Sequence, residues 1–198
     1  MKPIDRSEIL GIADYETIRE RFRAKIIRAK KHRRVALGPN ATVTFENRDT
    51  VLLQIQEMIR TERITRDAAI QHEIDTYNQL VPGDAELSCT LLIEIADKEE
   101  RDAFLVAARG FERHVSLVVG GERMPARWDA ALDLADRTAA VHYLKFALSE
   151  RAIGALRSAT GTDATITHVE LEVDHAAYQA RATLSAETII LLGEDLER

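Results

Sequence analysis

The sequence predicts an α+β protein in which an N-terminal block of about three helices packs on a mostly antiparallel sheet of about five to six strands with short helices. Apolar residues recur at helical spacing through residues 1–82, whereas they alternate with polar residues in most later segments. Pro82 and Gly83 separate the two patterns. We therefore expect a helical region over residues 1–82 and an α+β sheet region over residues 83–198, which fold as one cooperative unit.

The first helix is predicted to run from Tyr15 to about Arg34, with Asp14 as its N-cap. Its apolar stripe is narrow and consists of Ile18, Phe22, Ile26 and Ala29, with Ile27 beside it. A stripe this narrow predicts a single packing partner for the helix. It leaves the cationic sides of the helix facing water or anions.

Two further helices are predicted in the first region. The β-branched segment Ala41–Phe45 predicts a short strand or an extended connection before them. Asn47 or Asp49 then caps a second helix that ends near Glu62, and a third helix begins after Thr65.

Beyond Glu86, alternation predicts strands and capping residues predict short helices. The predicted strands are Leu87–Ile95, Val115–Val119, Arg123–Trp128, Thr138–Leu148, Thr165–Val173 and Tyr178–Leu184. The predicted helices are Lys98–Arg109, a segment capped by Ser149 that ends at Arg157, and a closing segment capped by Ser185 that ends near Leu196. Gly120-Gly121 predicts a two-residue hairpin turn, because glycine tolerates positive φ angles.

Composition places the chain among ordinary globular proteins. It has 198 residues, of which 45% are hydrophobic and 30% are charged. A single cysteine, Cys89, excludes an intramolecular disulfide and any zinc or iron–sulfur framework built from cysteines of one chain. The N-terminus lacks a signal-peptide core, and no stretch approaches the roughly 18 apolar residues of a membrane span. We therefore expect a cytoplasmic protein without a membrane partner.

Charge is distributed unevenly along the chain. Residues 1–34 contain 11 Lys and Arg against five acids, so this segment carries +6 and the remainder −12 of the net −6. Such a split can indicate nucleic-acid binding through the first helix. It can equally place a basic helix against an acidic surface of its own chain or of a partner. We favour the second interpretation, because the aromatic stacking platforms of single-strand binders are missing.

A run of long polar side chains makes Val43–Glu73 the first place to look for a site. The candidate ligand- or partner-binding residues are Arg34, Glu46, Arg48, Gln56, Glu57, Arg60 and Glu62. Glu57 and Arg60 are one helical turn apart and can pair on one face, and arginines of the first helix can reach Glu57 or Glu62. Structural ion pairs are the simplest interpretation of this cluster.

An enzyme or a binder of small anionic ligands is the alternative interpretation of the same cluster. Glu57 would then be the candidate catalytic base, and Arg48 or Arg60 would hold an anionic substrate. A di-iron centre is not expected, because the Glu-x-x-His motif that places both ligands on one helix face is absent.

The remaining metal-binding and nucleophilic residue types suggest little chemistry. His168 and Glu170 lie on one face of a predicted strand and are weak metal candidates, since an exposed strand face is usually only solvated. Cys89 alternates with apolar neighbours and is interpreted as a core thiol. His175 follows a predicted strand and is expected to bond to a turn carbonyl or to Tyr178. No metal and no cofactor are predicted.

Several motifs resemble a bacterial family known as domain of unknown function 3501. These motifs consist of Lys30, Lys31, Arg33, Arg34, Val35 and Gly38; Phe45–Arg48 and Thr50; Gln54–Met58, Arg60 and Glu62; Glu73, Ile74, Tyr77, Asn78, Leu80 and Pro82; Tyr143–Phe146; and Asp174, His175 and Tyr178. The helical motifs are the more specific part of the resemblance. Proline commonly follows the histidine in the family, whereas this chain has Ala176, so that turn is expected to be less rigid.

The resemblance implies a context rather than an activity. Members of the family are encoded beside a rubrerythrin-like protein and an iron–sulfur oxidoreductase. The resemblance therefore implies that this chain is a non-enzymatic accessory or assembly partner of an iron or iron–sulfur redox protein in oxidative stress. The basic first helix and Glu46–Glu62 would form the docking surface, and the narrow stripe of the first helix predicts a homodimer.

Overall fold

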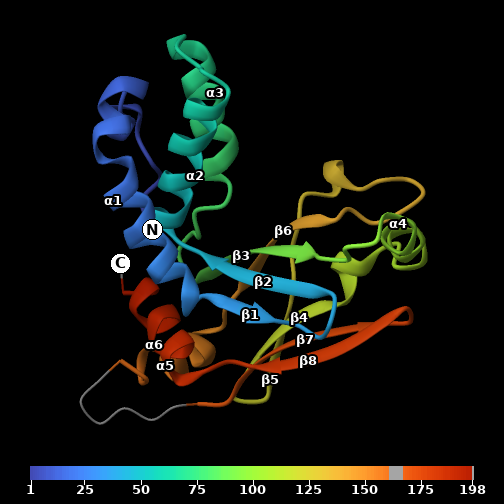
Figure 1. The fold of residues 1–198 in the computed structure, drawn as a ribbon. Helices are drawn as coiled ribbons and strands as arrows, with labels where there is room; N and C mark the ends of the chain where they lie inside the picture. Colours follow the sequence, from blue (N-terminus) through green and yellow to red (C-terminus); the bar gives the residue numbers. More distant parts are fainter. Residues whose placement is uncertain (161–166, 198) are drawn as a thin grey trace.

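The computed structural model describes residues 1–160 and 167–197, and within them the chain forms six α-helices and two four-stranded sheets (Figure 1). The predicted α+β class with antiparallel pairing is confirmed. The prediction of one sheet with five to six strands is wrong. Alternation of apolar residues identifies a strand and its buried face, but it does not identify the strand's hydrogen-bonding neighbours.

Both sheets are antiparallel throughout. The first sheet has the order β1-β2-β3-β6, with strands β1 (Arg34–Ala36), β2 (Ala41–Glu46), β3 (Glu86–Ile93) and β6 (Val141–Ala147). The second sheet has the order β5-β4-β7-β8, with strands β4 (Val115–Val119), β5 (Glu122–Pro125), β7 (Val169–His175) and β8 (Tyr178–Thr183). Strands from both sides of residue 82 therefore share the first sheet.

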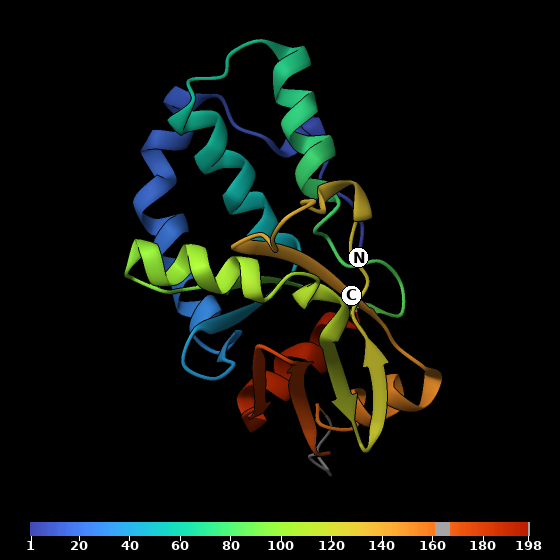
Figure 2. The same ribbon diagram turned by 90° about the vertical axis from the view of Figure 1, so that its right-hand side faces the viewer.

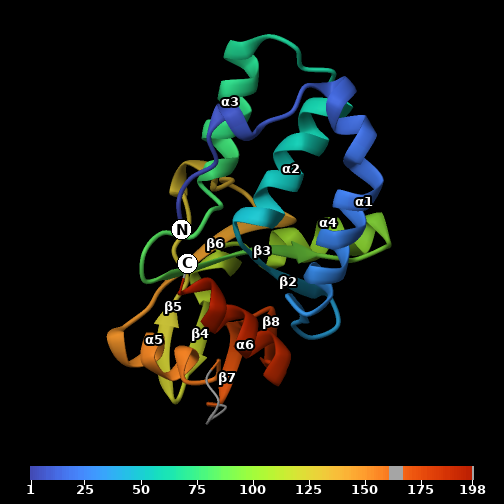
Figure 3. The same cartoon turned by 90° about the vertical axis from the view of Figure 1, so that its left-hand side faces the viewer.

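The helices form two groups at different places in the molecule. The six helices are α1 (Ile12–Lys31), α2 (Arg48–Thr61), α3 (Asp67–Asn78), α4 (Lys98–Ala107), α5 (Glu150–Arg157) and α6 (Ala186–Asp195). Helices α1, α2 and α3 stand together beyond one side of the first sheet, while α5 and α6 pack together at the second sheet (Figures 1 and 3). Helix α4 lies on its own beside the first sheet, as the view in Figure 2 shows.

Side-chain caps determine several of these boundaries. Asn47 caps α2, Ser149 caps α5 and Ser185 caps α6, each by accepting a hydrogen bond from a backbone N–H of the first turn, as the sequence predicted. Gly120 and Gly121 have φ angles of 56° and 84° in the turn that joins β4 to β5, as predicted. Residues 165 and 166 of the predicted strand Thr165–Val173 lie outside the described residues, and the strand extends instead to His175.

The boundaries of α1 differ from the prediction at both ends. Gly11 rather than Asp14 is the N-cap, and Asp14 lies in the first turn, where a carboxylate still interacts favourably with the helix dipole. The helix ends at Lys31, because the chain turns at His32 and residues Arg34–Ala36 pair with β2 as the edge strand β1. A three-residue strand leaves no periodic pattern by which the sequence could reveal it.

Two hydrophobic cores stabilise the fold. The larger core is built from both sheets together with α5 and α6, and Phe45, Phe111 and Phe146 are fully buried in it. The smaller core joins the N-terminal segment to α2 and α3 through Ile4, Ile55 and Ile74, among others. None of the helices in the described part of the chain is long and apolar enough to cross a membrane.

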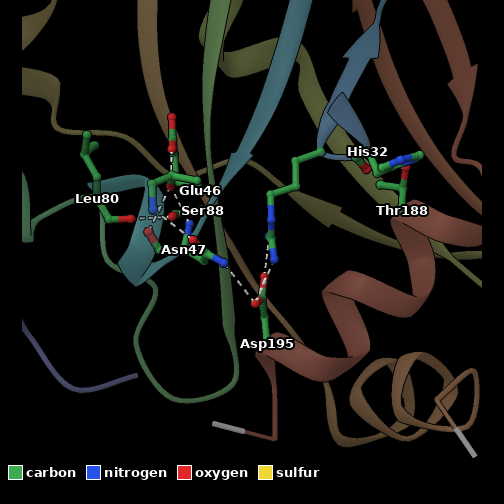
Figure 4. A network of polar contacts seen from close by, with 9 residues as sticks. His32, Glu46, Asn47, Leu80, Ser88, Thr188 and Asp195 are labelled. Carbon is green, nitrogen blue, oxygen red and sulfur yellow. Dashed lines mark hydrogen bonds and ion pairs between the residues drawn. The ribbon is translucent and has the colours of Figure 1, made fainter. Parts of the chain in front are cut away.

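A buried ion pair joins the N-terminal block to the C-terminal helix. The Arg33 guanidinium donates to both carboxylate oxygens of Asp195 at 2.5 and 3.0 Å, and both side chains are at most 4% exposed. The Asn47 amide donates to the same carboxylate at 3.4 Å, and the Thr188 hydroxyl donates to the His32 carbonyl at 2.7 Å (Figure 4). The end of α1, the start of α2 and helix α6 therefore share one polar network out of water.

The buried pair should be costly to break on one side only. We expect Asp195→Leu or Arg33→Met alone to lower the free energy of unfolding by about 3–5 kcal/mol, because each leaves a buried charge uncompensated. The double variant Arg33→Met/Asp195→Leu should cost much less than the sum of the single changes. Urea unfolding of the four proteins measures this cycle. Single-variant losses below about 1 kcal/mol would mean that water reaches the pair.

Candidate functional site

The predicted polar cluster is divided among separate ion pairs, of which the best formed is Glu57 with Arg19. The guanidinium of Arg19 donates to both oxygens of Glu57 at 2.8 Å, and the hydroxyl of Tyr15 donates to one of them at 2.7 Å. Both charged side chains are about a quarter exposed. The expected contact between the first helix and Glu57 is therefore present. Arg60 pairs instead with Glu16 at 2.5 Å, so the expected Glu57–Arg60 pair does not form.

Arg48 and Gln56 hold the N-terminal segment against α2. Arg48 donates to Glu8 at 2.5 Å and to the carbonyl of Lys2 at 3.0 Å. The buried amide of Gln56 both accepts from and donates to the backbone of Leu10, at 2.7 and 3.2 Å. These two predicted residues therefore fix the path of the chain before α1.

The other three predicted residues lie apart from these pairs. Glu46, at the end of β2, is buried and accepts hydrogen bonds from the hydroxyls of Thr50 and Thr90. Arg34 pairs with Glu94 at the surface of the first sheet, at 3.0 Å. Glu62 is exposed at the end of α2. The seven predicted residues thus do not converge on one cavity.

The geometry does not favour Glu57 as a general base. Its two oxygens are occupied by Arg19 and Tyr15, and the hydrogen bonds from Arg19 hold the pKa of the Glu57 carboxyl below its usual value. A base needs a raised pKa and a free lone pair facing a substrate proton.

The weak metal candidates His168 and Glu170 contact each other, and Glu170 also accepts a hydrogen bond from the Thr183 hydroxyl. His168 Nε2 lies 3.2 Å from Glu170, and the histidine side chain is more than half exposed. Within the described residues there is no group of three or more His, Cys, Asp or Glu that could hold a metal ion. Cys89 is a buried core thiol as predicted, and burial raises its pKa. His175 bonds to backbone groups, with Nε2 at 3.1 Å from the Arg109 carbonyl.

Helix α1 presents a cationic outer face. Only Tyr15 and Ile26 of its 20 residues are buried. Five exposed cations of α1 have no ion-pair or hydrogen-bond partner among the described residues, and one of them, Arg23, lies two residues beyond Arg21 and so on the opposite side of the helix from it. We call the other four the basic stripe: Arg21, Lys25, Arg28 and Lys31. The first three recur at the i, i+4 and i+7 spacing that places side chains on one helix face. Ile18, 37% exposed, lies one turn before Arg21 on the same side.

A polar cavity of about 530 Å³ contains a buried acid and a buried histidine that the sequence did not bring together. The Thr138 hydroxyl lies 3.1 Å from both Glu112 Oε2 and His142 Nε2, and His142 Nδ1 lies 3.9 Å from the same carboxylate. All three side chains are buried. Burial lowers the pKa of His142, and the nearby Glu112 partly opposes this effect.

A second, aromatic cavity of about 670 Å³ lies next to the polar one. It is lined by the end of α3, by β3 and β6, and by the chain that follows β5. Trp128, Asp129, Leu132 and Tyr143 line both cavities. The two cavities therefore meet at the β6 edge of the first sheet.

The edge of β6 carries unpaired backbone groups between the cavities. Ile93 bonds to Ala140 and Leu148 to Ala85, which makes the even-numbered residues of β6 those that bond to β3. The backbone N–H and C=O of Lys145 accordingly point away from β3, and they exchange two hydrogen bonds with the backbone of Arg127. Val141 and Tyr143 face the same way, and their backbone groups have no partner in the described part of the chain.

Sequence reasoning missed both cavities for a physical reason. Glu112, Thr138 and His142 come from a short helical turn, a loop and a strand that are up to 30 residues apart. No short motif joins them. The predicted strand Thr138–Leu148 in fact begins only at Val141, which leaves Thr138 in the loop before it. The one available signal was the single tryptophan, Trp128, next to a hairpin.

Two packed antiparallel sheets with a helical block define an α+β protein whose surface features are a basic helix and a double cavity. A family model described as "Protein of unknown function (DUF3501)" matches residues 3–196, so the chain belongs to this family. A crystal structure from Burkholderia pseudomallei K96243, described as a novel protein of unknown function, has a TM-score of 0.90 to this fold. It is 31% identical and covers 98% of this chain and 100% of its own. A search of the curated proteins found no match.

The Glu57 pair should contribute more to stability than the Arg60 pair on the same helix. We expect Glu57→Ala to lower the free energy of unfolding by roughly 1–2 kcal/mol, since it leaves Tyr15 and Arg19 without their acceptor. Arg60→Ala should cost less than about 0.5 kcal/mol, because its partner Glu16 is nearly half exposed. Urea unfolding at neutral pH compares the two variants. Equal losses would show that Glu57 is no more than a surface ion pair.

His142 should make the fold less stable in mild acid. Because its pKa is lowered in the folded state, the unfolded chain binds more protons below the ordinary value of 6.5, and stability falls as the pH drops through that range. His142→Gln should flatten the dependence between about pH 7.5 and 5.5, which urea unfolding at several pH values measures. The control is His72→Gln, which removes an exposed imidazole on α3. An unchanged slope in His142→Gln would exclude His142 as its source.

Proposed function

We propose that the protein is a non-enzymatic accessory or assembly partner that docks an acidic redox protein through helix α1. The observation that carries this proposal is the basic stripe, which is exposed along one face of a 20-residue helix without partners among the described residues. Four unpaired cations in a row attract an acidic surface and steer its approach. The family resemblance supplies the kind of partner, an iron or iron–sulfur protein of the rubrerythrin type.

The attachment of α1 to the body supports a docking role. Tyr15 and Arg19 bond to Glu57 near the start of the helix, and Arg33 is held by Asp195 just beyond its end. The helix is therefore fixed along its inner side while its outer side stays uncovered. A preorganised surface lowers the ordering cost of binding.

Pairing of two copies is the competing use of this helix. An isologous contact through the stripe would bring like charges of the two copies together, which opposes binding. We therefore assign the stripe to a partner of opposite charge, and the homodimer remains a prediction that would need another face. Nucleic acid is the other polyanion that could fit, and the test below separates the two.

Charge reversal should abolish capture of the partner. We expect the tagged protein, purified from native cells at about 0.05 M salt, to retain an iron-containing protein. The variant Arg21→Glu/Lys25→Glu/Arg28→Glu should retain at least about tenfold less, and so should the original at about 0.5 M salt. Iron content, visible absorbance and mass spectrometry of the co-purified protein provide the readout.

The matched control reverses three exposed arginines elsewhere, in Arg63→Glu/Arg66→Glu/Arg151→Glu, and should retain the partner. Equal capture by both triple variants, or recovery of the protein with no iron-containing partner, would contradict the proposal. So would salt-dependent binding of a labelled oligonucleotide that only the stripe variant loses, or a dimer that the stripe variant dissociates.

A further inference from the structure

The aromatic cavity lies away from the basic stripe and is independent of the docking role. Three aromatic side chains from separate elements line it: Tyr77 at the end of α3, Trp128 after β5, and Tyr143 on β6. Leu80, Leu132 and Leu144 complete its apolar lining. At about 670 Å³ it falls within the range of small-molecule sites, which are concave, mostly apolar and provided with a few polar groups.

The tryptophan of this cavity is held in place by its neighbours. Trp128 Nε1 donates to Asp133 at 2.9 Å, and the Arg113 guanidinium carbon lies 5.7 Å from the ring centroid. A cation above the ring and a hydrogen bond at its edge fix its orientation. The planar wall of the cavity is therefore formed before any ligand enters.

The formal charges of the lining balance, but one cation, Arg127, is left without an acidic partner in the described part of the chain and can bind an anion. Glu86 already pairs with Lys145 at 2.9 Å, and Asp129 already accepts from the Ala131 backbone at 2.9 Å. Arg127 has no acidic partner among the described residues, although its backbone is fixed by two hydrogen bonds to Lys145. The acids of the lining are thus occupied, while one guanidinium is available at the rim.

We propose that this cavity binds a small molecule with a planar aromatic body and one anionic group, such as a carboxylate or a sulfonate. The aromatic body packs against Trp128, Tyr77 and Tyr143. The anionic group pairs with Arg127, which as a planar guanidinium can donate two hydrogen bonds to it.

An extended peptide added to the β6 edge is the other occupant that the surroundings suggest. The unpaired backbone of Val141 and Tyr143 would serve such a strand. However, Arg127 already occupies the edge at Lys145, which leaves only these two residues available. Most strands are longer than two residues, so this edge provides too few backbone hydrogen bonds for a peptide strand, whereas the cavity suits a compact ligand.

Trp128 is the only tryptophan in the chain, so its fluorescence reports on a ligand in either of the two cavities that it lines, and Arg127, which lines only the aromatic cavity, distinguishes them. The probes are 1-anilinonaphthalene-8-sulfonate and its neutral analogue N-phenyl-1-naphthylamine, which differ only in the sulfonate. We expect both to bind and to change the Trp128 emission. Arg127→Gln should lower the affinity for the sulfonate probe by about tenfold and leave the affinity for the neutral probe unchanged, because only the charged contact is lost.

Matched variants test the location. Leu132→Glu should lower the affinity for both probes, since Leu132 lines the cavity. Because Leu132 is 60% exposed, the substitution should have little effect on folding stability. Val106→Glu alters a similarly exposed apolar residue on α4 and should leave both affinities unchanged. Thermal unfolding of each variant confirms that the fold is retained, and Leu132→Gln replaces Leu132→Glu if the charge lowers the melting temperature.

Several results would overturn the proposal. Probe binding without a change in Trp128 emission would place the dye elsewhere. Equal weakening of both probes by Arg127→Gln would remove the preference for an anion. Insensitivity to Leu132→Glu, or equal sensitivity to Val106→Glu, would exclude the cavity. Displacement of the bound probe by unrelated extended peptides, but not by small aromatic carboxylates, would assign the site to a peptide.

Discussion

The buried contact between Arg33 and Asp195 is the constraint on which the arrangement of the molecule depends. It joins residues 162 positions apart, and it closes the C-terminal helix onto the junction between α1 and the first sheet. Both charges lose their hydration at this point. The fold tolerates the pair because the guanidinium donates two hydrogen bonds to the carboxylate in place of water. Asn47 adds a further donor to the same carboxylate while its own side chain caps α2. The end of α1, the start of α2 and the end of α6 are thereby fixed relative to one another and to the first sheet.

This anchoring explains how a helix with little buried surface can be held in place. Amphipathic helices are usually stabilised by the burial of an apolar stripe, but α1 buries only two side chains. Its inner side is held instead by directional contacts: Tyr15 and Arg19 bond to Glu57, and Lys30 lies 3.8 Å from the buried Glu46. Polar attachment leaves the outer side without a structural task. The like charges found there repel one another, so this row of cations does not itself stabilise the helix.

The helical block and the cavities were predictable to different degrees. The apolar period and the caps gave all six helices, and alternation gave the longer strands, because both signals are local. The pairing of Glu57 with an arginine of the first helix was also expected, since opposite charges lay on adjacent helices. The seven candidate residues proved to be distributed over several contacts, because residues close together on a helix point in different directions and bond to different neighbours. Glu112, Thr138 and His142 could not be found this way, since their proximity depends on how η2 (Phe111–His114), a loop and β6 meet.

The sequence by itself determined the class of secondary structure, the caps Asn47, Ser149 and Ser185, the hairpin glycines, the core position of Cys89 and the membership of its family. Each of these depends on neighbouring residues or on the order of residues along the chain. Only the tertiary structure decided that the strands divide into two sheets, that Arg33 is buried rather than exposed, and that two cavities meet beside Trp128. The physical reason is the same in each case. Hydrogen-bond partners, burial of charge and the walls of a cavity are properties of segments far apart in the sequence, and they are defined only when those segments pack together.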